Sequence, residues 1–435
     1  MNGTLLQSSG NDFCDFIHER SRAGELVVQP RMGFSAPERM RAGLEAVLAT
    51  RATTVGTITV DSYTRVGDHG SAREALRTGV SLNGYPLVEH GAEVNRQLLA
   101  DLAGPDFPVQ LRHGSALPLQ LFEAMLAAGL TASEGGPVSY CLPYSRTPVA
   151  EATRAWADSC ELLARRAPAG QPVHLESFGG CMLGQLCPPG LLVALSVLEC
   201  LFFVQHGIGN VSLSYAQQTN PVQDLAALRA MRRLAAEFLG TVRWHVVLYT
   251  YMGVFPRTAA GALRLLEDSV RLARASGAER LVTKTAVEAQ RIPTVEENIE
   301  ALELAGDVAG RPDAAAEQSV TAEEEAVHLE ARTLVEATLS LHHDVGEALV
   351  RAFRQGLLDV PYCLHPDNAN LARTLIDGTG RLQWQRTGRM PIAAASARTA
   401  TGSPAFELLN RLSYIERRYD GELPGPARQV LNRAG

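Results

Sequence analysis

The fold is decided by FPVQLRHG, residues 107–114, together with LTASEGGPVSYCLPYSR, residues 130–146. The first stretch is a short apolar run that stops at Arg112, and the second stops in the same way at Glu134. Both charged residues are followed closely by glycine. In parallel α/β folds the residues at the carboxyl ends of the strands meet at one edge, where ligands bind. We therefore expect Arg112 and Glu134 to face a common site.

The segment between these two runs has the pattern of an amphipathic helix. Ser115 is the expected N-cap, Pro118 suits the first turn, and Gly129 ends the helix. A similar start is expected after residue 34, where Ser35-Ala36-Pro37-Glu38 resembles a capping box. The apolar face of the helix between the two quoted stretches consists of Leu121, Phe122, Met125 and Leu126.

The same strand–helix unit recurs along the chain, giving eight short apolar runs that mostly alternate with helical patterns. Eight such units in roughly 260 residues match a (β/α)8 barrel, which typically takes about 250. A doubly wound open sheet is the competing fold, but no G-x-G-x-x-G turn or Walker motif is present. The eight runs are Leu26–Gln29, Thr54–Val60, 107–111, Leu130–Ser133, Val173–Leu175, Val211–Ser214, Trp244–Leu248 and Arg280–Thr283.

This pattern predicts an N-terminal extension over residues 1–24 and a barrel carrying the active site over residues 25–300. Residues 301–435 are expected to form a linker, a helix and a cap-like appendage, because their composition changes and apolar runs become scarce. The helix is expected over Glu323–Leu341. His342-His343-Asp344 is interpreted as a solvated helix end rather than a metal site, because no further ligand lies at suitable spacing.

Composition excludes some classes of function. Of 435 residues, 46% are hydrophobic and 20% charged, with a net charge of −7, so no basic tract suits nucleic acid. The most apolar segment, Leu191–Val204, is too short to span a bilayer and contains Glu199, so it predicts a buried helix. The start of the chain lacks the features of a signal peptide, and seven cysteines lack paired spacing. We expect a cytoplasmic protein with reduced cysteines.

Three arginines at successive strand ends, Arg31, Arg65 and Arg112, predict a site for a ligand with two carboxylates, because guanidinium groups bind carboxylates bidentately. Glu134 would accept hydrogen bonds, or a proton, from an ammonium group of the same ligand. In the alternative interpretation, each arginine pairs with a neighbouring carboxylate and only stabilises the end of the barrel. The other residues expected at the strand ends are His113, Glu176, Phe178, Tyr215, Gln217, Tyr251, Met252, Lys284 and Glu288.

Two roles stay open on the residues alone. Tyr140 and Tyr144 suit packing and substrate contact equally well. Lys284 is compatible with a Schiff base and with a simple hydrogen bond to a ligand. A metal-dependent lyase would place more histidines and carboxylates at these positions, so we expect no metal ligands in this chain.

Several motifs closely resemble the large (epsilon) subunit of glutamate mutase, also called methylaspartate mutase, from about residue 25 to 300, with a weaker echo near Asp359–Pro391. This family has a barrel large subunit, depends on adenosylcobalamin, and interconverts glutamate and 3-methylaspartate by a radical rearrangement. The motifs are QPRMG, DSYTR, LNGYP, QLRHG, SEGGPVSYCLPY, ESFGG, YTYMGVFP and KTAVEA.

The resemblance implies roles residue by residue. The arginines that hold the substrate carboxylates fall on Arg31, Arg65 and Arg112, and the catalytic carboxylate near the substrate amino group falls on Glu134. The phenols fall on Tyr140 and Tyr144. Lys284 and Glu288 correspond to the pair that holds the adenosyl ribose, which decides against a Schiff base. The remaining cofactor contacts implied are Gly33, Thr59, Asn83, Phe178 and Met252.

The family's cobalamin-binding module carries D-x-H-x-x-G, and Asp68-His69-Gly70 does not fit that spacing. The resemblance therefore implies a separate cobalamin-binding small subunit, in a heterotetramer built on a dimer of large subunits. Cys181-Met182-Leu183 is more apolar than the family pattern near the cofactor, which is compatible with a variant substrate and with a pathway-specific mutase that makes methylaspartate for secondary metabolism. The alternatives are a related mutase acting on another 2-amino acid and a non-catalytic barrel that binds a dicarboxylate.

Overall fold

The computed structural model describes residues 13–167, 171–182, 184–311, 320–394 and 404–421. Eight parallel strands form one sheet in the order β1-β8-β7-β6-β5-β4-β3-β2. A bridge between Val28 and Thr54 joins its two edges, so the sheet closes into a (β/α)8 barrel and the predicted fold class is confirmed. The strands are β1 Val27–Gln29, β2 Gly56–Thr59, β3 Val109–Arg112, β4 Ala132–Gly135, β5 His174–Ser177, β6 Asn210–Ala216, β7 Arg243–Tyr249 and β8 Arg280–Val282.

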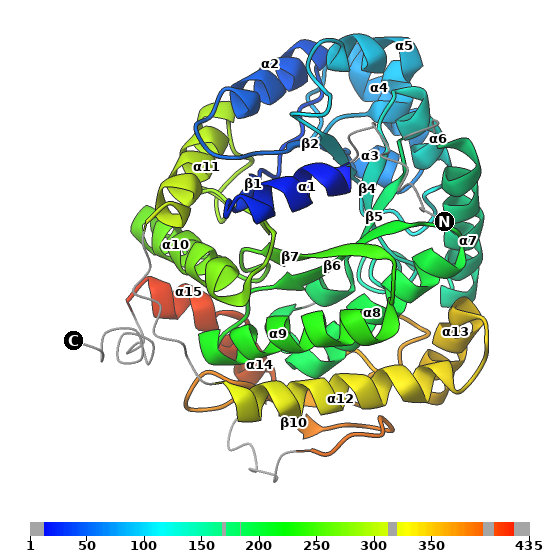
Figure 1. Ribbon diagram of the computed structural model, residues 1–435, viewed down its shortest axis with the longest axis vertical. Coiled ribbons are helices and arrows are strands. Elements are labelled where there is room, and N and C mark those ends of the chain that lie inside the picture. The colour runs from blue at the N-terminus through cyan, green and yellow to red at the C-terminus, as the bar shows by residue number, and fades with distance from the viewer. Residues whose placement is uncertain (1–12, 168–170, 183, 312–319, 395–403, 422–435) are drawn as a thin grey trace, which may run out of the picture.

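Helices surround the barrel (Figure 1). The segment after β2 is the longest excursion and contains three helices before β3 begins. Helix α8 contains Leu191–Val204 and is apolar on all sides, because it lies between the sheet and a further helix, α12 (Thr321–Leu339). The helices are α2 Pro37–Leu48, α3 Ser62–Arg65, α4 His69–Thr78, α5 Leu87–Leu99, α6 Leu119–Ala127, α7 Val149–Arg166, α8 Pro189–Gln205, α9 Pro221–Phe238, α10 Ala259–Ser276 and α11 Val295–Ala309.

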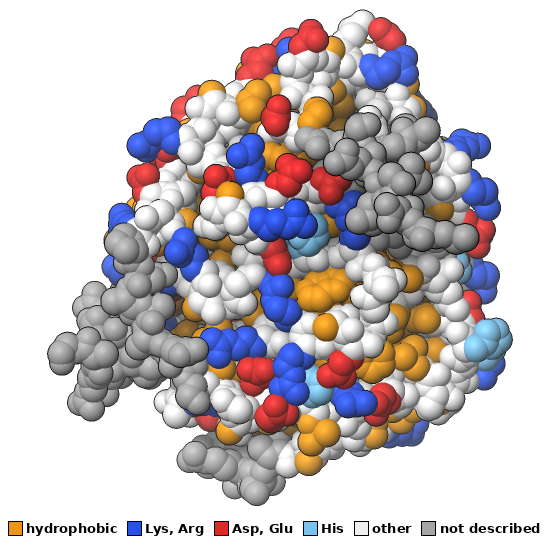
Figure 2. Space-filling view, viewed as in Figure 1, with side chains coloured by type: hydrophobic (Ala, Val, Ile, Leu, Met, Phe, Trp, Pro, Cys, Tyr) orange, Lys and Arg blue, Asp and Glu red, His pale blue; other side chains and the backbone are white. Residues whose placement is uncertain are grey.

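Helix α1, Phe13–Arg22, closes the end of the barrel at which the strands begin. Figure 1 shows it lying across the ring of strands. Its apolar side chains Phe13, Phe16 and Ile17 pack against Val27 and Val55 in a separate buried cluster. Acidic and basic side chains are interspersed on this face (Figure 2). The opposite end, where the strands finish, is left for a site.

The C-terminal part of the chain packs on the outside of the barrel. Helix α12, Thr321–Leu339, lies on α8 and α9, and α13, Val345–Gln355, packs against α7. Between α12 and α13, Asp344 accepts a hydrogen bond from the Glu347 backbone and caps α13. No described helix is long and apolar enough to cross a membrane. The remaining elements are the antiparallel pair β9 Arg373–Ile376 and β10 Leu382–Arg386, and the helices α14 Pro404–Leu412 and α15 Tyr414–Tyr419.

Two predicted helix caps are wrong. Helix α6 begins after Pro118, and the Ser115 hydroxyl instead accepts a hydrogen bond from Leu117 in the preceding turn. Helix α2 has Ala36 as N-cap and no side-chain capping bond, so Ser35 does not form a capping box. In α2, proline at the first position already fixes φ and removes one unsatisfied donor, which lessens the need for a polar cap.

Candidate active site at the carboxyl ends of the strands

The register of the sheet brings Arg112, Glu134 and Glu176 together. Thr59 pairs with Arg112, and Glu134 pairs with Glu176 on the neighbouring strand. Arg112 binds Glu134 with two nitrogens: Nε lies 3.1 Å from Oε1, and Nη2 lies 2.9 Å from Oε2. Both side chains are buried, at 4% and 1% exposure. Arg112 Nη1 has no hydrogen-bond partner among the described residues, so its two N–H groups remain for a ligand.

Glu134 also accepts hydrogen bonds from two phenols. The Tyr140 hydroxyl donates to Oε1, and the Tyr249 hydroxyl lies 2.8 Å from Oε2. Burial raises the pKa of the Glu134 carboxyl, although Arg112 opposes this effect. Burial alone would lower the pKa of Arg112, but the Glu134 carboxylate raises it overall. A buried carboxyl with a raised pKa suits proton exchange with a ligand.

A buried carboxylate on α8 holds the loop that carries Tyr140. Glu199 accepts hydrogen bonds from the backbone of Val138 at 3.1 Å and Ser139 at 2.8 Å, and from the Ser139 and Ser177 hydroxyls, each at 2.9 Å. A Cβ atom at Gly136 would lie 2.1 Å from this carboxylate, so only glycine permits the approach. Burial raises the pKa of Glu199 to about 7. From the sequence, the only sign of this role is a carboxylate within an apolar run.

Arg65 lies close to Gly114, two residues after Arg112, and the Tyr144 ring centroid lies 5.9 Å from that of Tyr140. Arg65 ends α3, whose N-terminus is capped by Asp61, and its guanidinium lies 5.8 Å from the Tyr144 ring centroid. Arg65 Nε has no hydrogen-bond partner among the described residues. Desolvation raises the pKa of the Tyr144 phenol, while the charges of Arg31 and Arg65 lower it. Arg65 and Tyr144 both line a cavity of about 430 Å³.

Arg31 is paired in this structure. Its Nη1 lies 2.8 Å from Glu288 Oε1, and Lys284 Nζ lies 3.1 Å from the same oxygen. Burial lowers the pKa of Lys284 to about 8. Burial alone would raise the pKa of Glu288, but Lys284 and Arg31 lower it overall. The alternative in which an arginine pairs with a neighbouring carboxylate is therefore observed for Arg31 and for Arg112 in this conformation, although Arg112 Nη1 and Arg65 Nε have no hydrogen-bond partner among the described residues.

Lys284→Met is expected to raise the melting temperature at pH 7 by roughly 1–3 °C. The pKa of Lys284 falls from 10.5 to about 8 on folding, so keeping it charged costs stability below pH 8. Between about pH 8 and 10.5 the unfolded chain binds more protons than the folded one, so the wild type gains stability and the advantage of the variant disappears. Melting curves across this range test the prediction. Because Lys284 is the only lysine in the sequence, ¹⁵N-lysine labelling also gives its pKa from one side-chain signal.

The residues that the family resemblance implies as cofactor contacts lie near the carboxyl ends of the strands. A Cβ at Gly33 would lie 2.2 Å from the Thr59 carbonyl oxygen, and the Thr59 hydroxyl is buried with no hydrogen-bond partner among the described residues. Asn83 is exposed and accepts a hydrogen bond from Ser62 at 3.0 Å. Phe178 is buried against Tyr140 and Tyr249, with ring centroids 5.1 and 5.6 Å away. Met252 follows β7 and is partly buried.

The side chains of several residues that were expected at this end of the barrel make contacts away from the candidate site. Tyr215 donates to Asp224 on α9 at 3.0 Å, and Tyr251 packs in a cluster with Phe255. His113 is buried near Trp156, where burial lowers its pKa to about 3. Of the apolar stretch noted above, Cys181 and Met182 are buried, and Leu183 lies outside the described residues.

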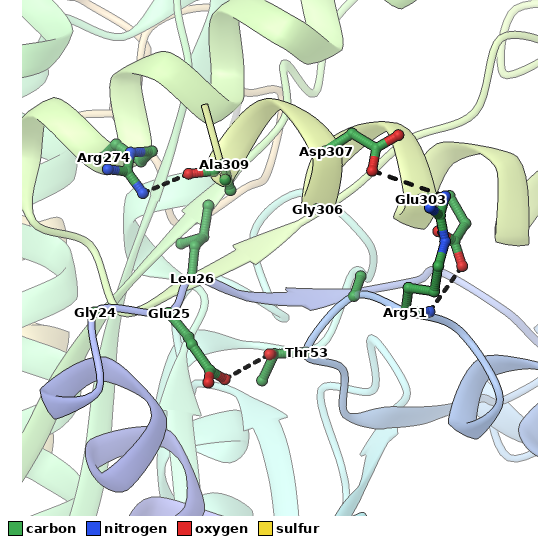
Figure 3. Close-up of a pocket in the computed structure, with 12 residues that line it drawn as sticks. Gly24, Glu25, Leu26, Arg51, Thr53, Arg274, Glu303, Gly306, Asp307 and Ala309 are labelled. Carbon is green, nitrogen blue, oxygen red and sulfur yellow. Dashed lines mark hydrogen bonds and ion pairs between the residues drawn. The ribbon is translucent and has the colours of Figure 1, made fainter. Parts of the chain in front are cut away.

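The opposite end of the barrel holds a cavity of about 350 Å³ (Figure 3). Its charged side chains are engaged with one another: Arg51 binds Glu303 at 2.7 Å, and Glu25 accepts from Thr53 at 2.6 Å. Such paired surface groups favour a structural role over a binding site.

Cys14, His174 and His245 lie buried together, with one potential ligand atom from each within 4.8 Å of the others. However, Arg280 Nη2 lies 3.4 Å from His245 Nε2 and can only donate, which leaves the proton on Nδ1, 3.8 Å from Cys14 Sγ. That tautomer cannot bind a metal through Nδ1. The sequence does not predict this cluster because its members lie on three distant elements.

Comparisons with known proteins show the family of this chain. Residues 9–403 match the family model for the methylaspartate mutase E chain. A glutamate mutase epsilon subunit from Halobacterium salinarum is 33% identical over 347 residues, covering 77% of this chain and 71% of the relative. The epsilon subunit from Escherichia coli O157:H7 is 29% identical over 380 residues, covering 81% and 78% respectively. The chain belongs to the methylaspartate mutase E chain family.

Proposed function

We propose that this chain is the catalytic subunit of an adenosylcobalamin-dependent carbon-skeleton mutase that interconverts L-glutamate and 3-methylaspartate. The observation that carries the proposal is the buried Arg112–Glu134 pair, in which Arg112 Nη1 has no hydrogen-bond partner among the described residues. One substrate carboxylate binds Arg112 and the other binds Arg65, with Arg31 joining when it leaves Glu288. Glu134 accepts a hydrogen bond or proton from the ammonium group, and Tyr140 and Tyr144 enclose the substrate.

The residues present fit the cofactor. Buried hydroxyls of Thr59 and Thr285 have no hydrogen-bond partner among the described residues, as expected where polar groups of a ligand are to be held. Lys284 and Glu288 would hold the ribose, and Gly33, Asn83, Phe178 and Met252 would contact the cofactor around them. When bound, adenosylcobalamin supplies the radical chemistry of hydrogen abstraction. The cofactor is shared with a separate cobalamin-binding small subunit in a cytoplasmic heterotetramer.

In this account the chain's own residues restrict the substrate. Two guanidinium groups fix both carboxylates while Glu134 fixes the amino group, so a fragment detached during rearrangement stays in position to recombine. Burial of Arg112 and Glu134 strengthens these contacts by excluding water.

The test is reconstitution with a cobalamin-binding small subunit from a glutamate mutase, adenosylcobalamin and glutamate, with product identified by NMR. We expect 3-methylaspartate to form only when all components are present. Turnover of another 2-amino acid instead would support the related mutase. Binding of glutamate without turnover of any 2-amino acid would support the dicarboxylate-binding barrel.

A further inference from the structure

Tyr249 occupies a position between two carboxylates. It ends β7, its side chain is fully buried, and its hydroxyl contacts Glu134 Oε2 at 2.8 Å and also Glu176 Oε1. Its ring lies 5.0 Å from the Arg112 guanidinium. A phenol has one proton and can donate to only one acceptor at a time. The hydroxyl therefore donates to one carboxylate, and its oxygen can accept from the other only when that carboxyl group is protonated.

The two carboxylates are held differently. Glu134 is bound by Arg112, and its register partner on the neighbouring strand is Glu176. Glu176 is bound from below by Arg280, and both of those side chains are fully buried. Gln110 Nε2 lies 3.2 Å from the same Glu176 oxygen that Arg280 contacts. The other oxygen of Glu176, Oε1, thus remains available to Tyr249.

We propose that Tyr249 is a positioning residue whose hydroxyl reorients with the protonation of Glu134. When Glu134 is ionised, the Tyr249 hydroxyl donates to Glu134 Oε2. When Glu134 takes a proton on Oε2, its new O–H group donates to the Tyr249 oxygen, and the Tyr249 hydroxyl turns to Glu176 Oε1. One N–H bond of the ligand ammonium breaks and one O–H bond forms on Glu134, while Tyr249 keeps its own proton throughout.

This inference rests on the proposed role of Glu134 towards a substrate ammonium group. Its consequence is that Glu134 Oε2 keeps a hydrogen-bond partner in both protonation states, whereas Glu176 Oε1 receives the Tyr249 proton only when Glu134 is protonated. The titratable or charged groups that act on Glu134 from the surrounding elements are Arg112, Tyr140, Tyr144, Glu176, Cys181 and Tyr249, with Arg280 behind Glu176.

The experiment measures the protonation of Glu134 directly in the chain alone. Infrared spectra are recorded across a pH series, and the Glu134 band is identified as the protonated-carboxyl band that disappears in Glu134→Gln. Three variants are compared: Tyr249→Phe, Glu176→Gln and Tyr251→Phe. Tyr251 is the matched control, because its hydroxyl is buried two residues away without a hydrogen-bond partner among the described residues.

Tyr249→Phe is expected to raise the pKa of Glu134 by about one unit, because a donor to a carboxylate is stronger than an acceptor for a neutral acid. Glu176→Gln is expected to lower it by about one unit, since a negative charge is lost and the amide holds the Tyr249 hydroxyl towards Glu134. Tyr251→Phe is expected to leave it unchanged. If Glu176→Gln does not fold, the double variant Glu176→Gln/Arg280→Gln takes its place, with the same downward shift expected.

An unchanged pKa of Glu134 in Tyr249→Phe, or shifts of the same sign in both variants, would overturn the proposal. In the reconstituted enzyme, the pKa given by the acid limb of the kcat/KM–pH profile is expected to rise in Tyr249→Phe and to fall in Glu176→Gln. Because the infrared titration needs neither cofactor nor partner, opposite shifts without any mutase turnover would retain the role of Tyr249 and reject the proposed function.

Discussion

Lysine in place of Arg112 is expected to lower kcat/KM for the mutase reaction by about a hundredfold or more. The Arg112 guanidinium binds Glu134 through Nε and Nη2 and leaves Nη1 for the substrate. An ammonium group cannot make these contacts in one plane, so the variant loses either the support of Glu134 or the substrate carboxylate. Steady-state kinetics of the reconstituted enzyme give the effect.

Arg232→Lys is the control for this substitution. Arg232 also binds a glutamate with two nitrogens, at 2.9 and 3.0 Å from the oxygens of Glu279, but away from the candidate site. We expect its activity to stay within about twofold of the wild type, since a partly exposed pair contributes little. Near-normal turnover in Arg112→Lys would remove Arg112 from the substrate site.

Glu134→Gln is expected to reduce kcat by about 10²–10⁴-fold, the range for loss of a group that exchanges protons with a substrate. The amide keeps the size of the carboxyl group but cannot accept a proton from an ammonium group at neutral pH. Its NH2 also offers donors where Arg112, Tyr140 and Tyr249 already donate. The kinetic comparison is made at saturating substrate, so that weaker binding does not hide the loss in kcat.

The same substitution is expected to lower the free energy of unfolding by about 3–5 kcal/mol, because it leaves Arg112 buried without its counter-charge. The double variant Arg112→Gln/Glu134→Gln is expected to recover most of this stability and none of the activity. Denaturant unfolding of the single and double variants separates the two effects. Full activity in the stable double variant would contradict the role given to Glu134.

The fold could be predicted because short apolar runs, several of them stopped by a charged residue or glycine, recur between helical patterns. The runs at Thr54–Val60 and Trp244–Leu248 contain β2 and most of β7. Eight such runs alternating with helices along the chain then predict a closed parallel sheet. Helix starts were harder to predict. Ser115 and Ser35 have the right chemistry for caps, but nearby prolines determine where the helices begin.

The site was predicted where a side chain belongs to a strand or its immediate end, as with Arg112 and Glu134. Beyond the last strand residue the alternation of side chains no longer holds, and the structure turns Tyr249 rather than Tyr251 towards Glu134. The supporting residues could not be found from spacing at all. Glu199 reaches its loop from a distant helix, and its contacts depend on tertiary packing.

The account is tested most directly by a crystal structure of the chain assembled with a cobalamin-binding small subunit in the presence of 3-methylaspartate. It predicts one substrate carboxylate on Arg112 Nη1, the other on Arg65, and the ammonium group within hydrogen-bond distance of Glu134. A substrate bound away from Arg112 and Glu134, or held with its ammonium group turned from Glu134, would contradict it.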